Sequence, residues 1–444
     1  MFLHLEKQKN EPLYAQIYKQ IKENILSGSL KSHEKLPGKR QLKTDLAVSM
    51  TTIETAYRLL MDEDLIYSRE KSGCYVSELD TLRTEHKTSP EINKPEPVVY
   101  QLPLASVDTS IVQNDVIKQI SKNVFNNHTL LNQGAPSGET ELKDAVMDYL
   151  HINRGAACSR DQIFIGPSTE YLLNQVLYLL KRPSITIEDP GYPMLKGVLN
   201  RLNMPFDIAE VETDGINIKD VQALNNTVTH VTPSHQFPGG SVLSLNKRIQ
   251  LLNHAAACGS YIIEDDYDSE FRYTGKPLPS LQGLDQNDRT IYMNTFSKSI
   301  YPSLRLAVMV LPKETAEEYY RHGLSCNVSR HIQHITADFI NGGYLERHIN
   351  RVRKIYGEKM ERITDYIESN YPGAAVQGAH TGMHFILKVP GIDVSKYAEK
   401  HRLLCMNHYA VQDKFKDSII VGIGEQSAGE IMKILNMFLK DAIQ

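Results

Sequence analysis

The sequence predicts an α/β protein in two parts, a small helical domain followed by a large domain built around a mainly parallel sheet. Three observations support this architecture. At 444 residues the chain is too long for one ordinary core. Residues 1–78 have helical periodicity, whereas from about residue 100 to residue 444 short apolar runs alternate with helical stretches. Residues 79–99 are polar and rich in proline, which is typical of an extended linker.

Composition limits the classes of function. The formal net charge of -4 gives no overall signal for nucleic acid, so any DNA-binding surface must be local. The five cysteines are scattered without zinc or disulfide spacing, which predicts no metal site and reduced thiols. The sequence lacks a signal-peptide pattern, and its apolar runs are shorter than the roughly 18 residues of a membrane span. We expect a soluble cytoplasmic protein without membrane partners.

The first eighty residues predict three helices and a hairpin. Leu13, Ile17, Ile21 and Ile25 recur every four residues, which indicates an amphipathic helix that ends at Gly28. A second helix is expected over residues 39–46. After it Ser49 is a good helix N-cap, and Ile53, Ala56, Tyr57 and Leu60 share one face of a third helix. Two short helices joined tightly are typical of a helix-turn-helix.

Two predicted strands follow, over residues 65–67 and 74–76, around a hairpin tip at residues 69–73 that carries cations. This hairpin would form a wing. Between Lys31 and Lys43 there are five Lys or Arg residues against one Glu, so positive charge gathers where phosphates would be met. The alternative is a small structural helical domain with a solvated basic loop.

Several local motifs make this region resemble the winged helix-turn-helix domain of GntR-type bacterial regulators: Pro12-Leu13-Tyr14, Lys35-Leu36-Pro37, Arg40-Gln41-Leu42, Thr51-Thr52-Ile53-Glu54-Thr55-Ala56-Tyr57 and Ser72-Gly73-Cys74-Tyr75-Val76. The resemblance implies that residues 1–78 bind a double-stranded DNA operator. The residues that it assigns to the DNA interface are Lys39, Arg40, Ser49, Thr51, Thr52, Lys71, Ser72 and Gly73.

The most informative segment of the large domain surrounds Lys298, which lies among small hydroxyl residues with Arg305 seven positions later. Residues 291–293 read as a short buried strand, so Lys298 would lie just past a strand's carboxyl end, where open α/β sheets bind ligands. A lysine forms an imine with an aldehyde only as the neutral amine, and we expect Arg305 to favour that state and to bind phosphate. The alternative is a solvated surface turn.

Other chemically useful residues also follow predicted strands. Ser168 and Thr169 occupy a turn at a helix N-terminus, which is a ready phosphate site. Tyr192 follows residues 185–187 and offers a ring for stacking. His235 and Gln236 lie in a turn-rich loop and are candidates to meet a cofactor hydroxyl.

Asp265 and Tyr267 follow the strand expected over residues 261–263. A carboxylate there would keep a pyridine nitrogen protonated, and Tyr267 would hydrogen-bond an oxygen on the ring. The alternative for this acidic cluster is a solvated loop or a divalent-metal site. The presence of Lys298, a phosphate turn and an aromatic ring, each after a strand, favours a cofactor site.

These motifs resemble fold-type I aminotransferases that use pyridoxal 5'-phosphate, and residues 100–444 are closer still to the aminotransferase-like domain of MocR-type regulators. The motifs are Gly138-Glu139-Thr140-Glu141-Leu142, Asp189-Pro190-Gly191-Tyr192, Thr232-Pro233-Ser234-His235-Gln236-Phe237-Pro238, Glu264-Asp265-Asp266-Tyr267-Asp268-Ser269-Glu270-Phe271 and Thr295-Phe296-Ser297-Lys298. The resemblance implies a large domain with a smaller C-terminal α+β subdomain, and a homodimer.

The resemblance also implies a role for each site residue. Lys298 would form the internal aldimine, Asp265 would pair with the pyridine nitrogen, Tyr267 would meet the phenolic oxygen and Tyr192 would stack on the ring. The phosphate would be surrounded by Ser168, Thr169, Thr295, Ser297 and Arg305.

The chain departs from aminotransferases where many relatives bind the substrate carboxylate with arginine. The C-terminal stretch here is Ser418-Ile419-Ile420-Val421-Gly422, and Met194 stands at a second position that can carry arginine. Substitutes would be Arg201, Arg330 or Arg402.

Two functions remain in view. The first is a transcriptional regulator that senses pyridoxal phosphate, an amine or an amino acid. The second is an active aminotransferase with an accessory N-terminal module. The basic helix-turn-helix and the absent carboxylate arginine favour the regulator over the enzyme.

Overall fold

The computed structural model describes residues 3–6, 11–78, 98–104, 106–275 and 278–443. The chain divides into two compact units, Met1–Glu96 and Pro97–Gln444. Most of the expected linker, residues 79–97, lies outside the described residues. Within the described residues, no helix is long and apolar enough to cross a membrane.

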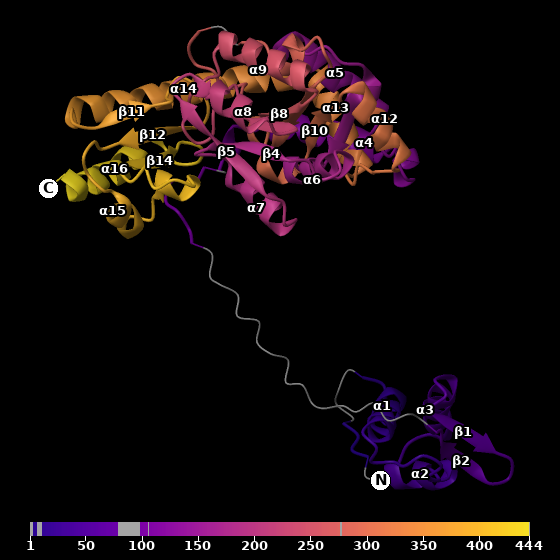
Figure 1. Ribbon diagram of the computed structural model, residues 1–444. Coiled ribbons are helices and arrows are strands. Elements are labelled where there is room, and N and C mark those ends of the chain that lie inside the picture. The colour runs from indigo at the N-terminus through magenta and orange to yellow at the C-terminus, as the bar shows by residue number, and fades with distance from the viewer. Residues whose placement is uncertain (1–2, 7–10, 79–97, 105, 276–277, 444) are drawn as a thin grey trace. The chain divides into compact units, whose positions relative to one another are not determined.

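The N-terminal unit is a winged helix-turn-helix (Figure 1). The predicted apolar stripe of the first helix is buried, together with the apolar face of the third. Ser49 caps the third helix as expected, because its side chain accepts a hydrogen bond from the Thr52 N–H at 3.1 Å. The elements are α1 (Leu13–Leu26), α2 (Lys39–Leu46), α3 (Met50–Asp62), β1 (Ile66–Arg69) and β2 (Gly73–Val76).

The wing differs slightly from expectation, because its strands extend further toward the tip. β1 continues to Arg69 and β2 begins at Gly73, and these two residues pair in the antiparallel ladder. The turn is therefore confined to residues 70–72. Lys71 adopts a positive φ of 58°, which lets the chain reverse within so few residues.

The large unit contains an eight-stranded sheet with strand order β3-β10-β9-β8-β7-β4-β5-β6. Within this order the neighbours β9, β8, β7, β4 and β5 pair in parallel. β10 pairs antiparallel with β3 and β9, and β6 pairs antiparallel with β5. The mainly parallel sheet is thus confirmed. The strands are β3 (Ile163–Gly166), β4 (Ile185–Asp189), β5 (Phe206–Glu212), β6 (Gly215–Ile216), β7 (Val228–Val231), β8 (Tyr261–Asp266), β9 (Thr290–Thr295) and β10 (Ala307–Val310).

Helices cover both faces of this sheet because successive strand residues point to opposite sides (Figure 1). Ile163 and Ile165 pack in one core, whereas Phe164 between them packs in another. One face is covered by α4 (Asn114–Phe125), α5 (Thr140–Arg154), α8 (Ile218–Leu224), α9 (Leu245–Cys258) and α13 (Arg330–Asn341). The other is covered by α6 (Thr169–Leu179), α7 (Pro193–Arg201) and α12 (Lys313–Arg321).

The C-terminal part forms the expected smaller α+β subdomain around an antiparallel sheet of order β11-β12-β14-β13. Its core is a separate apolar cluster that includes Phe385, Val421 and Phe438. The elements of this subdomain are α14 (Tyr344–Asn370), β11 (Ala375–Gln377), β12 (His384–Lys388), α15 (Ser395–Lys400), β13 (Leu404–Cys405), β14 (Ser418–Gly422) and α16 (Ala428–Ile443). The large sheet domain also contains two short helices, α10 (Leu281–Leu284) and α11 (Phe296–Ser299).

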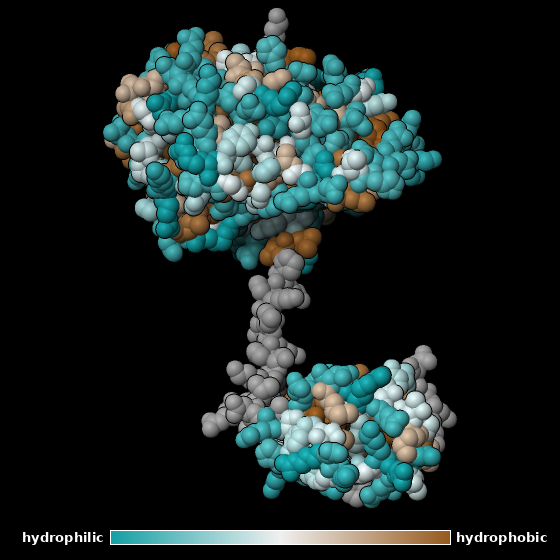
Figure 2. Space-filling model, turned by 90° about the vertical axis from the view of Figure 1, so that its right-hand side faces the viewer, coloured by the Kyte–Doolittle hydropathy of each residue, from teal (hydrophilic) through white to brown (hydrophobic). Residues whose placement is uncertain are grey.

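The visible surface of the large unit is mostly hydrophilic, with small separate hydrophobic spots (Figure 2). Single exposed apolar side chains such as Ile152 and Tyr178 are ordinary on protein surfaces.

Candidate functional site

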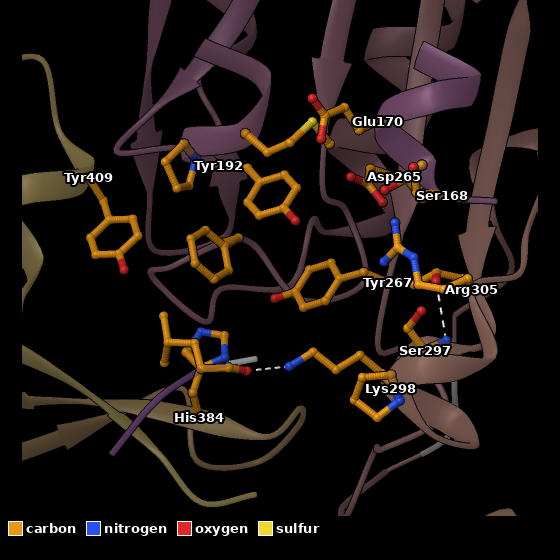
Figure 3. Close-up of a pocket in the computed structure, with 17 residues that line it drawn as sticks. Ser168, Glu170, Tyr192, Asp265, Tyr267, Ser297, Lys298, Arg305, His384 and Tyr409 are labelled. Atoms are coloured by element: carbon orange, nitrogen blue, oxygen red, sulfur yellow. Dashed lines mark hydrogen bonds between the residues drawn. The ribbon is translucent and has the colours of Figure 1, made fainter. Parts of the chain in front are cut away.

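A cavity of about 390 Å³ opens at the carboxyl ends of the parallel strands. This volume falls in the range of small-molecule sites. Asp265 lies in β8 and Tyr267 directly after it, Lys298 lies in α11 directly after β9, and Tyr192 follows β4. Figure 3 shows these side chains around one common space. Ligands of open α/β sheets bind at this edge, which makes the cavity the candidate site.

The structure brings together nine of the eleven residues that were predicted to bind a cofactor. Those that line the cavity are Ser168, Thr169, Tyr192, Asp265, Tyr267, Thr295, Ser297, Lys298 and Arg305. His235 and Gln236 are not among the lining residues. Each is only 1% exposed. His235 Nδ1 lies 2.8 Å from Asp268 Oδ2, and Gln236 Nε2 donates to the Pro190 carbonyl, whereas His235 Nε2 is buried without a partner among the described residues.

Lys298 reaches across the cavity, and its ammonium group donates a hydrogen bond to the Leu104 carbonyl (Figure 3). Burial lowers the pKa of Lys298 to about 8, although the nearby Asp268 carboxylate opposes this shift. The expectation that Arg305 lowers this pKa is wrong, because withdrawal from water is the cause. At neutral pH a useful fraction of this lysine is the reactive neutral amine.

Asp265 is 3% exposed, and its Oδ1 atom has no hydrogen-bond partner among the described residues. Its Oδ2 atom is 3.8 Å from the His230 ring. Burial first, and then the neighbouring Asp266 and Asp268 carboxylates, raise the pKa of Asp265 to about 7. A buried carboxyl oxygen without a partner calls for a donor or a cation, which a ligand in the cavity would supply.

One end of the cavity is suited to an anion. Ser168 caps α6, where its Oγ accepts from the Tyr171 N–H at 3.1 Å, and Thr169 opens that helix. Helix N-termini attract phosphate through free N–H groups and the helix dipole. Ser297 and Arg305 lie at the same end (Figure 3). This grouping supports the predicted phosphate position.

Two tyrosines complete the middle of the cavity. The Tyr267 hydroxyl donates to the His235 carbonyl at 3.0 Å, and burial raises its pKa well above the usual value. The Tyr192 ring packs edge-on against Phe237 with centroids 5.2 Å apart. Both rings line the cavity, Tyr267 held by this hydrogen bond and Tyr192 by its packing against Phe237.

Sequence reasoning missed the opposite end of the cavity, which includes Leu104, Phe237, His384 and Tyr409. The Phe237 ring centroid lies 5.4 Å from that of His384 and 5.5 Å from that of Tyr409. His384 and Tyr409 come from the C-terminal subdomain, and no local motif marks either residue. A lone histidine before an apolar run was the only available signal.

The three arginines considered as carboxylate partners do not line the cavity. Arg330 forms an ion pair with Glu139 at 2.8 Å, Arg201 pairs with Glu170, and Arg402 is exposed. Their charges are therefore not offered to a ligand in this cavity.

The N-terminal unit presents most of the predicted DNA-contacting positions at its surface. Arg40 in α2, Thr51 at the start of α3 and Lys71 at the wing tip are exposed, as are Ser49 and Gly73. The remaining three, which are Lys39, Thr52 and Ser72, are half-buried.

Comparisons with known proteins agree with this division. Residues 13–76 match the family described as bacterial regulatory proteins, gntR family. The chain is 37% identical to the HTH-type transcriptional regulator YdeL of Bacillus subtilis over 85% of this chain and 84% of the relative. It is 29% identical to the probable rhizopine catabolism regulatory protein MocR of Rhizobium meliloti over 81% of this chain and 78% of the relative.

A solved structure resembles the large unit. The multiple substrate aminotransferase of Thermococcus profundus superposes with a TM-score of 0.70 at 20% identity, covering 78% of this chain and 92% of that one. This likeness shows the aminotransferase fold. With the gntR-family domain at its start and regulators as relatives over most of its length, the chain belongs to the MocR-type transcriptional regulators.

Proposed function

We propose that this regulator binds pyridoxal 5'-phosphate through Lys298 and that an amine-type effector in the same cavity controls its binding to a DNA operator. The observation that carries the proposal is the presence in one cavity of Lys298, with a pKa of about 8, and of Asp265, whose Oδ1 atom has no hydrogen-bond partner among the described residues. When bound, this cofactor supplies an aldehyde that condenses with amines and a ring that accepts electrons.

The residues fit this group by their chemistry. Lys298 offers an amine that is readily neutral, and Asp265 offers an unpaired oxygen to a protonated ring nitrogen. The N-terminus of α6 and Arg305 offer donors to the phosphate. Tyr192 offers a ring to the cofactor ring.

The test is the visible absorption of the purified full-length protein with pyridoxal phosphate. Wild type should develop an imine band, and borohydride reduction should fix the cofactor on the Lys298 peptide. Lys298→Ala should show no band, whereas the control Lys313→Ala, which alters an exposed lysine, should behave as wild type. A band that persists in Lys298→Ala would falsify the assignment.

An active aminotransferase is the second candidate, because the same lysine, acid and anion end would serve catalysis. The absence of an arginine other than Arg305 among the described lining residues argues against efficient handling of amino acids. Release of a keto acid after mixing the loaded protein with amino acids would identify the enzyme. A stable spectral change without keto acid would identify the sensor.

We also infer a homodimer that reads two half-sites, because two-fold symmetric regulators match palindromic operators. Sedimentation of the full-length protein should give the mass of two chains. A monomer that binds one half-site would contradict this inference.

A further inference from the structure

The cavity is polarised between its two ends. The anion end contains Ser168 and Arg305, and from there the Lys298 side chain extends toward His384 (Figure 3). Its ammonium group donates to the Leu104 carbonyl. If the proposed cofactor occupies the anion end, the effector must occupy the end that contains Leu104, Phe237, His384 and Tyr409, which we call the aromatic end. The chemistry of that end then restricts the effector.

The aromatic end offers no permanent positive charge. Among the described lining residues the cationic side chains are Lys298 and Arg305. In the proposed function Arg305 would hold the cofactor's phosphate, and Lys298 would hold its carbonyl carbon until the effector amine takes that place. His384 is neutral, because burial and the nearby His235 and Lys298 hold its pKa well below the usual value.

The hydrogen-bonding groups at this end also favour a donor over an anion. His384 Nε2 lies 3.1 Å from the Pro238 carbonyl, so this nitrogen donates and the other ring nitrogen is left as an acceptor. The Leu104 carbonyl already accepts a hydrogen bond from an ammonium group, that of Lys298. An amine meets acceptors at the Leu104 carbonyl and at His384, and the Tyr409 hydroxyl can accept from it as well. A carboxylate would meet the same two acceptors, with only a neutral hydroxyl as donor among the described residues that define this end.

The remaining surface is apolar or aromatic. Phe237 is 7% exposed; its ring meets Tyr192 and Tyr409 edge-on and lies tilted against His384. A buried carboxylate without a cation is costly, whereas an apolar body gains from leaving water. Met194, which is half-buried and lines the cavity, adds a flexible apolar side chain.

We infer that the effector is a primary amine with an aromatic or branched apolar body and no carboxylate. This inference rests on the proposed function, and it names the ligand class that the aromatic end accepts. It also separates this regulator's ligand from the amino acids that aminotransferases use.

The experiment compares matched ligands that differ only by the α-carboxylate: 2-phenylethylamine against L-phenylalanine, and 3-methylbutylamine against L-leucine. Each is titrated into the full-length protein loaded with pyridoxal phosphate, and the shift of the visible band gives the half-saturating concentration. Each amine should saturate at a concentration at least tenfold lower than its amino acid. Equal or tighter binding of the amino acids overturns the inference, as does a band that neither amine shifts.

A pair of variants tests whether the lack of a cation at the aromatic end is what disfavours a carboxylate. Met194→Arg places a cation in the cavity and should move the preference toward the amino acids by tenfold or more, whereas the neutral Met194→Gln should keep the wild-type order. An unchanged order in a folded, cofactor-loaded Met194→Arg protein contradicts the charge argument. If pyridoxal phosphate gives no imine band at all, the proposed function itself has failed, and this is seen before any amine is added.

Discussion

The proposed DNA-binding surface and the cavity of this protein differ in how their candidate residues are held. Arg40 and Lys71, the proposed DNA contacts, are exposed side chains in α2 and at the tip of the wing. Lys298 and Asp265 are held by the ends of neighbouring strands. Burial lowers the pKa of Lys298 and raises the pKa of Asp265, so that both shifts favour the neutral form. The comparison shows that candidate residues on the surface can be recognised from the residue type alone, whereas the properties of those in the cavity depend on neighbours distant in sequence.

Asp265→Asn should give the largest effect. Because folding raises the pKa of Asp265 from 3.8 to about 7, the stability that it contributes is present at low pH and is lost as pH rises through 7. Removing the charge should raise the free energy of unfolding of the cofactor-free protein by about 4 kcal/mol at pH 8 and by less than half of that at pH 5. The same variant should lose pyridoxal phosphate more readily.

Thermal unfolding at both pH values measures this effect. Asp148→Asn, which alters an exposed carboxylate on α5, is the control and should change little at either pH. Destabilisation of the cofactor-free protein by Asp265→Asn at pH 8 would show that this carboxylate already has a favourable partner.

The rate of cofactor attachment should depend on pH through Lys298. A pKa of about 8 means that the neutral amine becomes the main form above that pH. Attachment should therefore become about tenfold faster from pH 7 to pH 9 and then level off. Stopped-flow absorbance would show this profile, whereas a rate that still rises steeply beyond pH 9 would indicate an ordinary exposed lysine.

Arg40→Ala should weaken operator binding by several-fold to about tenfold and reduce the dependence of affinity on salt, because one exposed cation is lost. The cavity should be unaffected, so the imine band should stay as in wild type. Lys19→Ala is the matched control, since Lys19 is an exposed cation of α1 that pairs with Glu11. Equal losses in the two variants would move the DNA surface away from α2.

Ser49→Ala should have the smallest effect, about 1 kcal/mol, because it removes the side-chain cap of α3. Hydrogen exchange of α3 amides in the full-length protein would report this loss as easier opening. Ser32→Ala alters an exposed serine and should leave α3 unchanged. A change in the imine band of Ser49→Ala would break the separation between the two functional regions.

Much of the fold could be predicted because its signals are local. The periodicity of Ile17 and Ile21 and the cap at Ser49 depend on residues within one or two helical turns. The placement of Lys298 after a strand likewise follows from a short apolar run. The strand ends were less accurate, as in the wing, where pairing with the neighbouring strand extends β1 to Arg69.

The candidate site could be predicted only in part. Residues after strands converge on one edge of the sheet by topology, which is why Lys298 and Asp265 were grouped correctly. His384 and Tyr409 enter from the smaller subdomain, and packing of two separate cores decides their position. The cause of the Lys298 pKa shift was also missed, because burial is a property of the folded chain.

The most direct test of the account is operator affinity measured before and after loading with pyridoxal phosphate, and again with a saturating amine, in wild type and in Lys298→Ala. The account predicts that loading or the amine changes the affinity of wild type by about fivefold or more, as is typical of coupled sites, and leaves Lys298→Ala unchanged. Equal affinities of wild type in all three states would contradict it, because the cavity would then have no influence on DNA binding.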